Sequence, residues 1–193
     1  MMAKGIGLCG AHRTGKTTMT RQCARDYALA LVTTDTSAVF AEHGLDPAAP
    51  MDFATRLWIQ DKVLVAGEAV WGGQERPFIT DRTPLDMLAY TLGDIRGDTK
   101  ADPAQLADYT AHCFAATNRY FRQLLVIQPA IPLVAEPGKA ALNEAYMEHL
   151  NHLVIGLCGA EEQQLPFAIL PRPLLDLAER CAWLAEKCAL PGQ

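Results

Sequence analysis

A chain of 193 residues, half of them apolar and a fifth charged, has the composition of one globular domain, residues 1–193, that buries both faces of a sheet. Its net charge of −5 argues against a broad nucleic-acid-binding surface, and no apolar run approaches the roughly 20 residues of a membrane-spanning helix. The six cysteines never form the Cys-x-x-Cys pattern of a metal site, so we expect buried thiols in a reducing cytoplasm.

The first predicted strand covers residues 5–9, and its unbroken apolar run indicates burial on both faces. A helix is predicted over residues 16–28. Between them lies a complete G-x-x-x-x-G-K-T motif, and strand, glycine loop and helix in this order identify a phosphate-binding loop. In such a loop, backbone N–H groups and the positive end of the helix dipole surround the phosphates. The residues expected to bind the nucleotide here are Gly10, Ala11, His12, Arg13, Thr14, Gly15, Lys16, Thr17 and Thr18.

Two side chains of this loop have specific chemical roles. Lys16 is expected to bridge the β- and γ-phosphates of ATP, and the hydroxyl of Thr17 to take one Mg²⁺ position. The motif therefore predicts ATP and Mg²⁺ as cofactors.

The second predicted strand covers residues 30–34 and ends at Asp35. A carboxylate at the carboxyl end of a strand faces the crevice where open α/β sheets hold ligands. Asp35 is alternatively a plain N-cap for residues 36–38. The pattern alone leaves both interpretations open.

A long helix over residues 53–71, capped by Asp52, is predicted next. Gln60 interrupts its apolar stripe, with Arg56 one turn earlier. Polar groups on a buried face need partners, which a bound acceptor would supply. The interruption is equally explained by a helix that turns toward solvent.

The third predicted strand, residues 78–80, is followed directly by Asp81 and Arg82. A strand that ends in an acid is the arrangement in which a carboxylate orders Mg²⁺, and the adjacent arginine would neutralise phosphate charge. An ordinary surface ion pair is the alternative. Residues 83–86 then predict a helix start, with an N-cap threonine, proline at the first position and an acid at the third.

The C-terminal half continues the alternation of helices and strands. Asp102 is predicted to cap a helix that precedes a strand at residues 124–127, and another helix begins after Asn143. A strand over residues 166–170 and a helix through residues 174–184 complete the chain. Strands that alternate with helices indicate a parallel sheet.

With Asp81 and Arg82 placed after the loop of residues 10–18, the chain resembles the P-loop kinases of nucleosides and nucleotides. It is most similar to the small kinases related to the nicotinamide riboside kinase domain of bacterial NAD-biosynthesis regulators. The resemblance covers most of the chain and includes residues 88–90, Leu-Ala-Tyr, which are less specific. It implies a three-layer α/β fold, with a five-stranded parallel sheet in the order 2-3-1-4-5 and helices on both faces.

The resemblance also implies an activity, in which ATP with Mg²⁺ phosphorylates a hydroxyl of a nucleoside- or nucleotide-like small molecule. Asp35 matches the general base of related nucleoside kinases, Asp81 the metal-associated acid, and Arg82 its phosphate-binding partner. Gln60 is similar to the amide that pairs with a base in deoxynucleoside kinases. The expected sets are Lys16, Asp35, Asp81 and Arg82 for catalysis, Thr17 and Asp81 for the metal, Asp35, Arg56, Gln60, Arg82 and Lys139 for the acceptor, and Arg172 in addition to the loop for the nucleotide.

Residues 129–143, rich in proline, are expected to form a lid over the phosphates. Related kinases usually have two or more arginines in the lid, whereas this segment has only Lys139. Arg119 and Arg122 precede the predicted fourth strand. The source of the transition-state charge is therefore left open.

Two other functions fit the same motifs. Phage P-loop kinases that phosphorylate 5-hydroxymethyluracil within DNA share the donor site, the metal and the base, and would flip the target base into the pocket. The acidic net charge favours the small molecule, whereas a compact basic rim would favour DNA. A non-catalytic nucleotide switch would need neither Asp35 nor an acceptor pocket. The residues of this basic rim for DNA would be Arg56, Arg82, Arg119, Arg122 and Lys139.

The sequence leaves the oligomeric state open, with a homodimer as one option.

Overall fold

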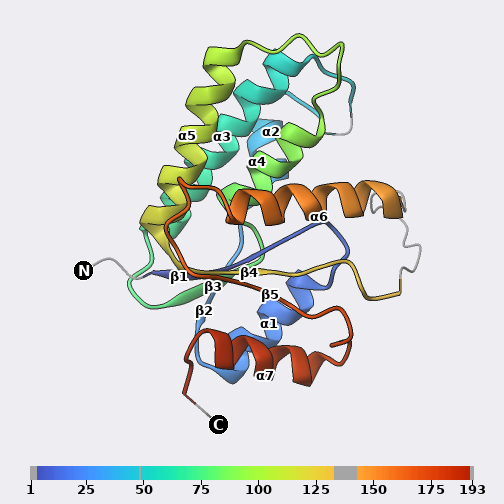
Figure 1. Cartoon of the computed structure of the whole chain (residues 1–193). Helices are drawn as coiled ribbons and strands as arrows, with labels where there is room; N and C mark the ends of the chain where they lie inside the picture. Colours follow the sequence, from blue (N-terminus) through green and yellow to red (C-terminus); the bar gives the residue numbers. More distant parts are fainter. Residues whose placement is uncertain (1–3, 48, 133–142, 192–193) are drawn as a thin grey trace.

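Five parallel strands form the centre of the computed structural model, in the order β2-β3-β1-β4-β5 (Figure 1). This order confirms the expected 2-3-1-4-5 sheet. The structure describes residues 4–47, 49–132 and 143–191. The strands are β1 (Gly5–Cys9), β2 (Ala30–Val32), β3 (Phe78–Thr80), β4 (Phe121–Val126) and β5 (Phe167–Ile169).

Helices cover both faces of the sheet, which gives the three-layer architecture (Figure 1). One layer consists of α1 and α7, and the other contains the longer helices α3, α5 and α6 together with α4. None of the described helices is long and apolar enough to span a bilayer. The helices are α1 (Lys16–Asp26), α2 (Thr36–Glu42), α3 (Phe53–Gly72), α4 (Pro84–Gly93), α5 (Pro103–Tyr120), α6 (Glu144–Cys158) and α7 (Leu177–Lys187).

Side-chain alternation along the strands fills two cores. In β1, Ile6 and Leu8 face α1 and α7, whereas Cys9 faces the opposite layer. On that opposite side, the rings of Phe78 and Phe121 meet edge to face at a centroid separation of 5.8 Å. A sheet buried on both faces requires such continuously apolar strands, as predicted for residues 5–9.

The main difference from the predicted elements is at β4, which begins at Phe121 and not at Leu124. Helix α5 passes into this strand without a loop, so the chain has no turn residues to mark the boundary. Gly5 pairs with Phe121, but the next residue of β1 pairs with Gln123, so that Arg122 is an extra, bulged residue. Arg122 therefore lies within the strand and does not precede it.

Smaller differences concern the ends of other elements. Helix α1 ends at Asp26, two residues before the predicted end, and α7 begins at Leu177 because Asp176 caps it. The helix start predicted at residues 83–86 is confirmed: Thr83 and Asp86 form a complete capping box at α4.

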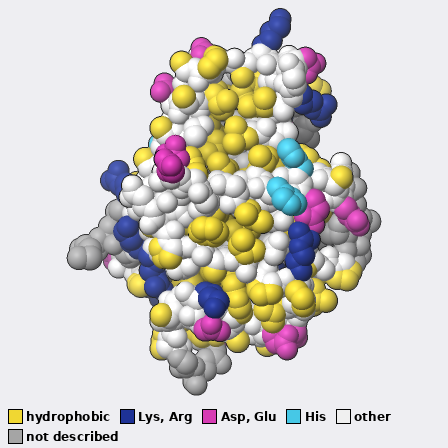
Figure 2. Space-filling view, viewed as in Figure 1, with side chains coloured by type: hydrophobic (Ala, Val, Ile, Leu, Met, Phe, Trp, Pro, Cys, Tyr) yellow, Lys and Arg dark blue, Asp and Glu magenta, His cyan; other side chains and the backbone are white. Residues whose placement is uncertain are grey.

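The surface in Figure 2 has apolar side chains over the layer that contains α3 and α5 and around the β5 edge of the sheet, with charged side chains dispersed between them. Large apolar side chains that are exposed in the structure include Trp58, Val65, Phe167 and Ile169. Basic side chains do not gather into one patch on this face.

His112 of α5 lies between two carboxylates of α3. Its Nδ1 is 3.0 Å from Asp61 Oδ1 and its Nε2 is 2.8 Å from Glu68 Oε2. An ionised carboxylate only accepts hydrogen bonds, so both contacts are hydrogen bonds only when the ring is protonated and both of its nitrogens donate. Burial lowers the pKa of His112, but the hydrogen bonds to Glu68 and Asp61 outweigh burial and raise the pKa above its ordinary value.

Because the pKa of His112 is raised in the folded state, its stabilising effect is complete below the unfolded pKa of about 6.5 and is lost as pH rises through the folded pKa. We expect His112→Gln to lower the melting temperature by about 2 °C at acidic pH and by less at alkaline pH. Circular dichroism melts at about pH 5.5 and about pH 8.5 measure this difference, with His152→Gln on α6 as the control. An equal loss at both pH values would contradict it.

Candidate functional site

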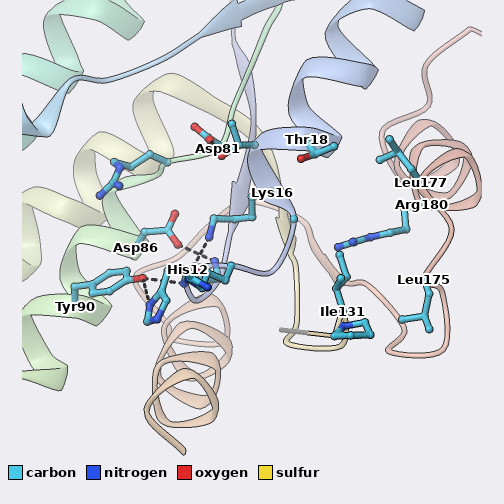
Figure 3. A pocket seen from close by; sticks show the side chains of 16 residues that line it. His12, Lys16, Thr18, Asp81, Asp86, Tyr90, Ile131, Leu175, Leu177 and Arg180 are labelled. Carbon is cyan, nitrogen blue, oxygen red and sulfur yellow. Dashed lines mark hydrogen bonds between the residues drawn. The ribbon is translucent and has the colours of Figure 1, made fainter. Parts of the chain in front are cut away.

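A cleft of about 600 Å³ lies at the carboxyl ends of β1 and β3, along the phosphate-binding loop (Figure 3). On one side of Lys16, Figure 3 shows Asp81 and two side chains of α4. On the other side, the cleft is lined by Ile131, Leu175 and Leu177. The predicted loop and the predicted Asp-Arg pair therefore meet in one cavity.

The two motif glycines have backbone conformations that other residues rarely adopt. Gly10 has φ +139° and Gly15 has φ +84°. A Cβ on Gly10 would collide with the carbonyl oxygen of Ile127, so this position also requires a glycine for space. The two glycines of the motif therefore allow the backbone conformation that the loop adopts.

The N-terminus of α1 is open to an anion. Gly15 is its N-cap, no side chain caps the helix, and no acidic residue lies in its first turn. The first N–H groups of a helix have no partner within the helix, so these donors and the positive dipole end point to the cleft. This is the geometry of a phosphate site.

Lys16 lies along the inside of the loop. Its ammonium donates to the carbonyl oxygens of Gly10 and Ala11, both at 2.7 Å. Burial lowers the pKa of Lys16, and the neighbouring Asp86 acts in the opposite direction. The cationic group therefore lies at the loop end of the cleft, bonded to two carbonyl oxygens of the loop.

Thr17 and Asp81, the predicted metal ligands, are brought together. The Thr17 hydroxyl donates a hydrogen bond to the Asp81 carboxylate. A hydroxyl and a carboxylate are the kind of oxygen ligands that Mg²⁺ takes, with water and phosphate oxygens completing its coordination. The part of the chain that the structure describes has no cluster of three or more His, Cys, Asp or Glu side chains suited to a metal ion. These two residues therefore fit Mg²⁺ only together with a bound phosphate.

Asp86, predicted only as a cap, is also part of the site. The residue is 2% exposed, and its carboxylate accepts the Gly10 N–H at 2.7 Å as well as the N–H and the hydroxyl of Thr83. A Cβ on Gly7 would lie 2.6 Å from the Thr83 methyl group, so a glycine in β1 lets the start of α4 approach this closely. The local sequence pattern predicts the capping role of Asp86. It cannot predict the hydrogen bond to Gly10, because the two residues are 76 positions apart in the sequence.

Arg180 of α7 is a second site residue that the sequence analysis missed. The residue is 2% exposed, and its guanidinium donates from Nη2 to the carbonyl oxygen of Thr14 at 2.9 Å. The guanidinium is in close contact with the loop, since a Cβ on Gly15 would lie 3.0 Å from Arg180 Nη1. A single arginine in an amphipathic helix has no sequence signal that distinguishes it from a surface residue.

Several predicted site residues lie elsewhere. Asp35 is exposed and caps α2, accepting the Ala38 N–H at 3.0 Å, as its alternative interpretation predicted. Arg56 pairs with Asp94 at 3.0 Å and borders a second pocket of about 560 Å³. Gln60 is partly buried on the same helix. The described residues that line the main cleft include none of the three predicted residues.

Arg172 also lies outside the lining of the cleft. It forms a two-pronged ion pair with Glu148 of α6, at 2.5 and 2.8 Å, and donates to the carbonyl oxygen of Pro129. It connects the segment after β5 to α6 and to the segment after β4. Most of the predicted lid, including Lys139, is outside the described residues.

A scan against protein-family models found no match, and a search of curated proteins also found none. The structure is similar to deoxyadenosine kinase from M. mycoides with bound dCTP, with a TM-score of 0.66 and 15% identity over 96% of this chain and 98% of that chain. It is similar to the NadR protein in complex with NAD and AMP-PNP, with a TM-score of 0.66 and 12% identity over 100% of this chain and 51% of that chain. Thymidylate kinase from Ehrlichia chaffeensis gives a TM-score of 0.64 and 12% identity over 98% and 100%.

These neighbours are P-loop kinases of nucleosides or nucleotides, and this chain has their fold. The chain spans about half the length of the NadR chain that it matches. At such low identity the similarity defines the fold alone.

Two arginines from the C-terminal segment allow a matched test of the site. Arg180→Lys removes the planar group that holds Thr14, so we expect roughly tenfold weaker binding of an ATP analogue. Arg172→Lys disturbs the exposed pair with Glu148 and the hydrogen bond to Pro129, both made by a residue outside the lining of the cleft, so we expect little change. Titration calorimetry measures both. A larger loss in Arg172→Lys would favour its predicted role at the nucleotide.

Proposed function

We propose that this protein is an ATP- and Mg²⁺-dependent kinase that transfers the γ-phosphate to a hydroxyl of a nucleoside- or nucleotide-like small molecule. The observation that carries this proposal is the single cleft that joins the phosphate-binding loop to Asp81 and Arg82. Its neighbours of similar fold are kinases whose structures hold dCTP, or NAD with AMP-PNP. Donor and acceptor would therefore bind on the two sides of Lys16.

The donor would take the side of the cleft near α7. Its triphosphate would lie on the open N-terminus of α1 and on Lys16. Leu175, Leu177 and Ile131 offer an apolar surface for the base. Thr17 and Asp81 would hold Mg²⁺, which neutralises charge on the phosphates when it is bound.

Stabilisation of the transferred group would come from cations that line the cleft. Arg13, Lys16 and Arg82 all do so, and Arg82 directly follows Asp81 on the acceptor side. Phosphoryl transfer depends mainly on positioning and on charge placed where it develops in the transition state. Arginines from the loop and from the end of β3 would thus replace the arginines that the predicted lid lacks.

The small-molecule acceptor is favoured over DNA by the distribution of basic side chains. The described members of the predicted rim are separated, since Arg122 donates to the Cys188 carbonyl near the end of α7 and Arg56 pairs with Asp94. Arg119 lies against the ring of Tyr120 at the end of α5. Binding to a DNA backbone draws on several phosphate contacts at once, which such a dispersed set does not offer.

A transfer assay from labelled ATP tests this function directly. The panel contains free nucleosides, nucleotides, nicotinamide riboside and DNA with 5-hydroxymethyluracil, each at two salt concentrations. We expect label on a free nucleoside or nucleotide, and none with Lys16→Ala, which removes the phosphate-binding cation. Label only on DNA, at a rate that falls steeply with salt, would establish the alternative acceptor. ATP hydrolysis without transfer would indicate a switch.

We propose Asp35 as the base that would take the proton of the acceptor hydroxyl, because it follows the end of β2 beside the end of β3, although it is outside the described lining of the cleft. Asp35→Asn should then lower turnover by about 10²–10⁴-fold while leaving ATP affinity unchanged. The matched control is Asp52→Asn, because Asp52 caps α3 in the same way and asparagine is an equally good N-cap. Single-turnover kinetics separate the two variants. Equal, small effects would make Asp35 only a cap.

A further inference from the structure

Two side chains of α4 hold the first part of the phosphate-binding loop. Asp86 accepts the Gly10 N–H at 2.7 Å, and the hydroxyl of Tyr90 accepts the His12 N–H at 2.9 Å. Asp86 and Tyr90 are four residues apart, so they lie on the same face of the helix. Both also line the cleft, on the same side of Lys16 (Figure 3).

The carboxylate of Asp86 has little freedom to move. Its second oxygen accepts the Thr83 N–H at 2.9 Å and the Thr83 hydroxyl at 2.8 Å, and Thr83 is itself fully buried against β1. The place of the Gly10 amide is therefore set by the start of α4. That start directly follows Asp81 and Arg82, so one helix holds the loop and the acid–arginine pair at a fixed separation.

Tyr90 makes two contacts with His12. Besides accepting the backbone N–H, its hydroxyl lies 3.2 Å from His12 Nδ1. Burial lowers the pKa of His12 and raises the pKa of Tyr90, which favours a neutral imidazole beside a protonated hydroxyl. The hydroxyl can then donate to Nδ1 while it accepts from the backbone. A phenylalanine in its place could do neither.

We propose that Asp86 and Tyr90 are positioning residues for the triphosphate, which hold the peptide groups of residues 10–12 so that the later loop amides converge on the phosphates. The Gly10 and His12 amides are bonded to α4, whereas the amides at the N-terminus of α1 have no side-chain cap. The phosphates are thus bound by the second part of the loop, and the first part is a fixed support. This inference rests on the proposed nucleotide site.

The test is Tyr90→Phe, which removes one hydroxyl, with Tyr109→Phe as the matched control. Tyr109 is 4% exposed on the neighbouring helix α5, and it does not line the cleft. Calorimetry with an ATP analogue should show roughly tenfold weaker binding for Tyr90→Phe and no change for the control. Without nucleotide, both variants should melt close to the wild-type temperature.

Amide hydrogen exchange gives a readout that does not depend on activity. The His12 amide should exchange faster in Tyr90→Phe, because its acceptor is gone, and Asp86→Asn should have a weaker effect at Gly10 because its amide oxygen still accepts. Wild-type ATP affinity in Tyr90→Phe, or an equal loss in Tyr109→Phe, would overturn the inference while leaving the proposed function intact. A wild-type protein that does not bind ATP would overturn both.

Discussion

The unpaired N–H groups at the start of α1 are the constraint around which the cleft is arranged. A helix that begins at Gly15 without a cap keeps donors that only an anion or water can satisfy. The loop that presents them is supported from two layers of the molecule, by α4 through Asp86 and Tyr90 and by α7 through Arg180. These contacts from α4 and α7 hold the loop, because no side chain caps its own N–H groups at the start of α1.

The charges under the loop are balanced within the protein. Burial raises the pKa of Asp86, while Lys16 and the Gly10 and Thr83 hydrogen bonds oppose that rise. Phosphates that enter the cleft compete with Asp86 and with two carbonyl oxygens for the Lys16 ammonium. In the proposed complex, the flexible side chain of Lys16 would exchange these partners for phosphate oxygens.

The alternation of strands and helices and the motifs that line the cleft were predictable from local signals, whereas the strand order was expected from the family resemblance. The glycine loop, the Asp81-Arg82 pair and the α4 cap each occupy a few consecutive residues, and the structure brings the first two into one cleft. Asp86 and Arg180 were not predictable as site residues, since their contacts with the loop cross 76 and 166 residues. For Asp35 the sequence leaves two roles open, because a carboxylate at a strand end and a helix cap have the same local pattern.

The bulge at Arg122 has a consequence for how a helix and a strand can be joined. Phe121, Leu124 and Val126 all face the core on the α3 and α5 side, although an unbroken strand would place odd and even positions on opposite faces. After Phe121, the extra residue therefore exchanges the faces of the sheet toward which odd- and even-numbered side chains of β4 point. Helix α5 can therefore run directly into the strand with Phe121 still in the core on its own side of the sheet. Leu125 and Ile127 nevertheless reach the opposite core, against α1 and α7. One unmatched residue takes the place of a connecting loop.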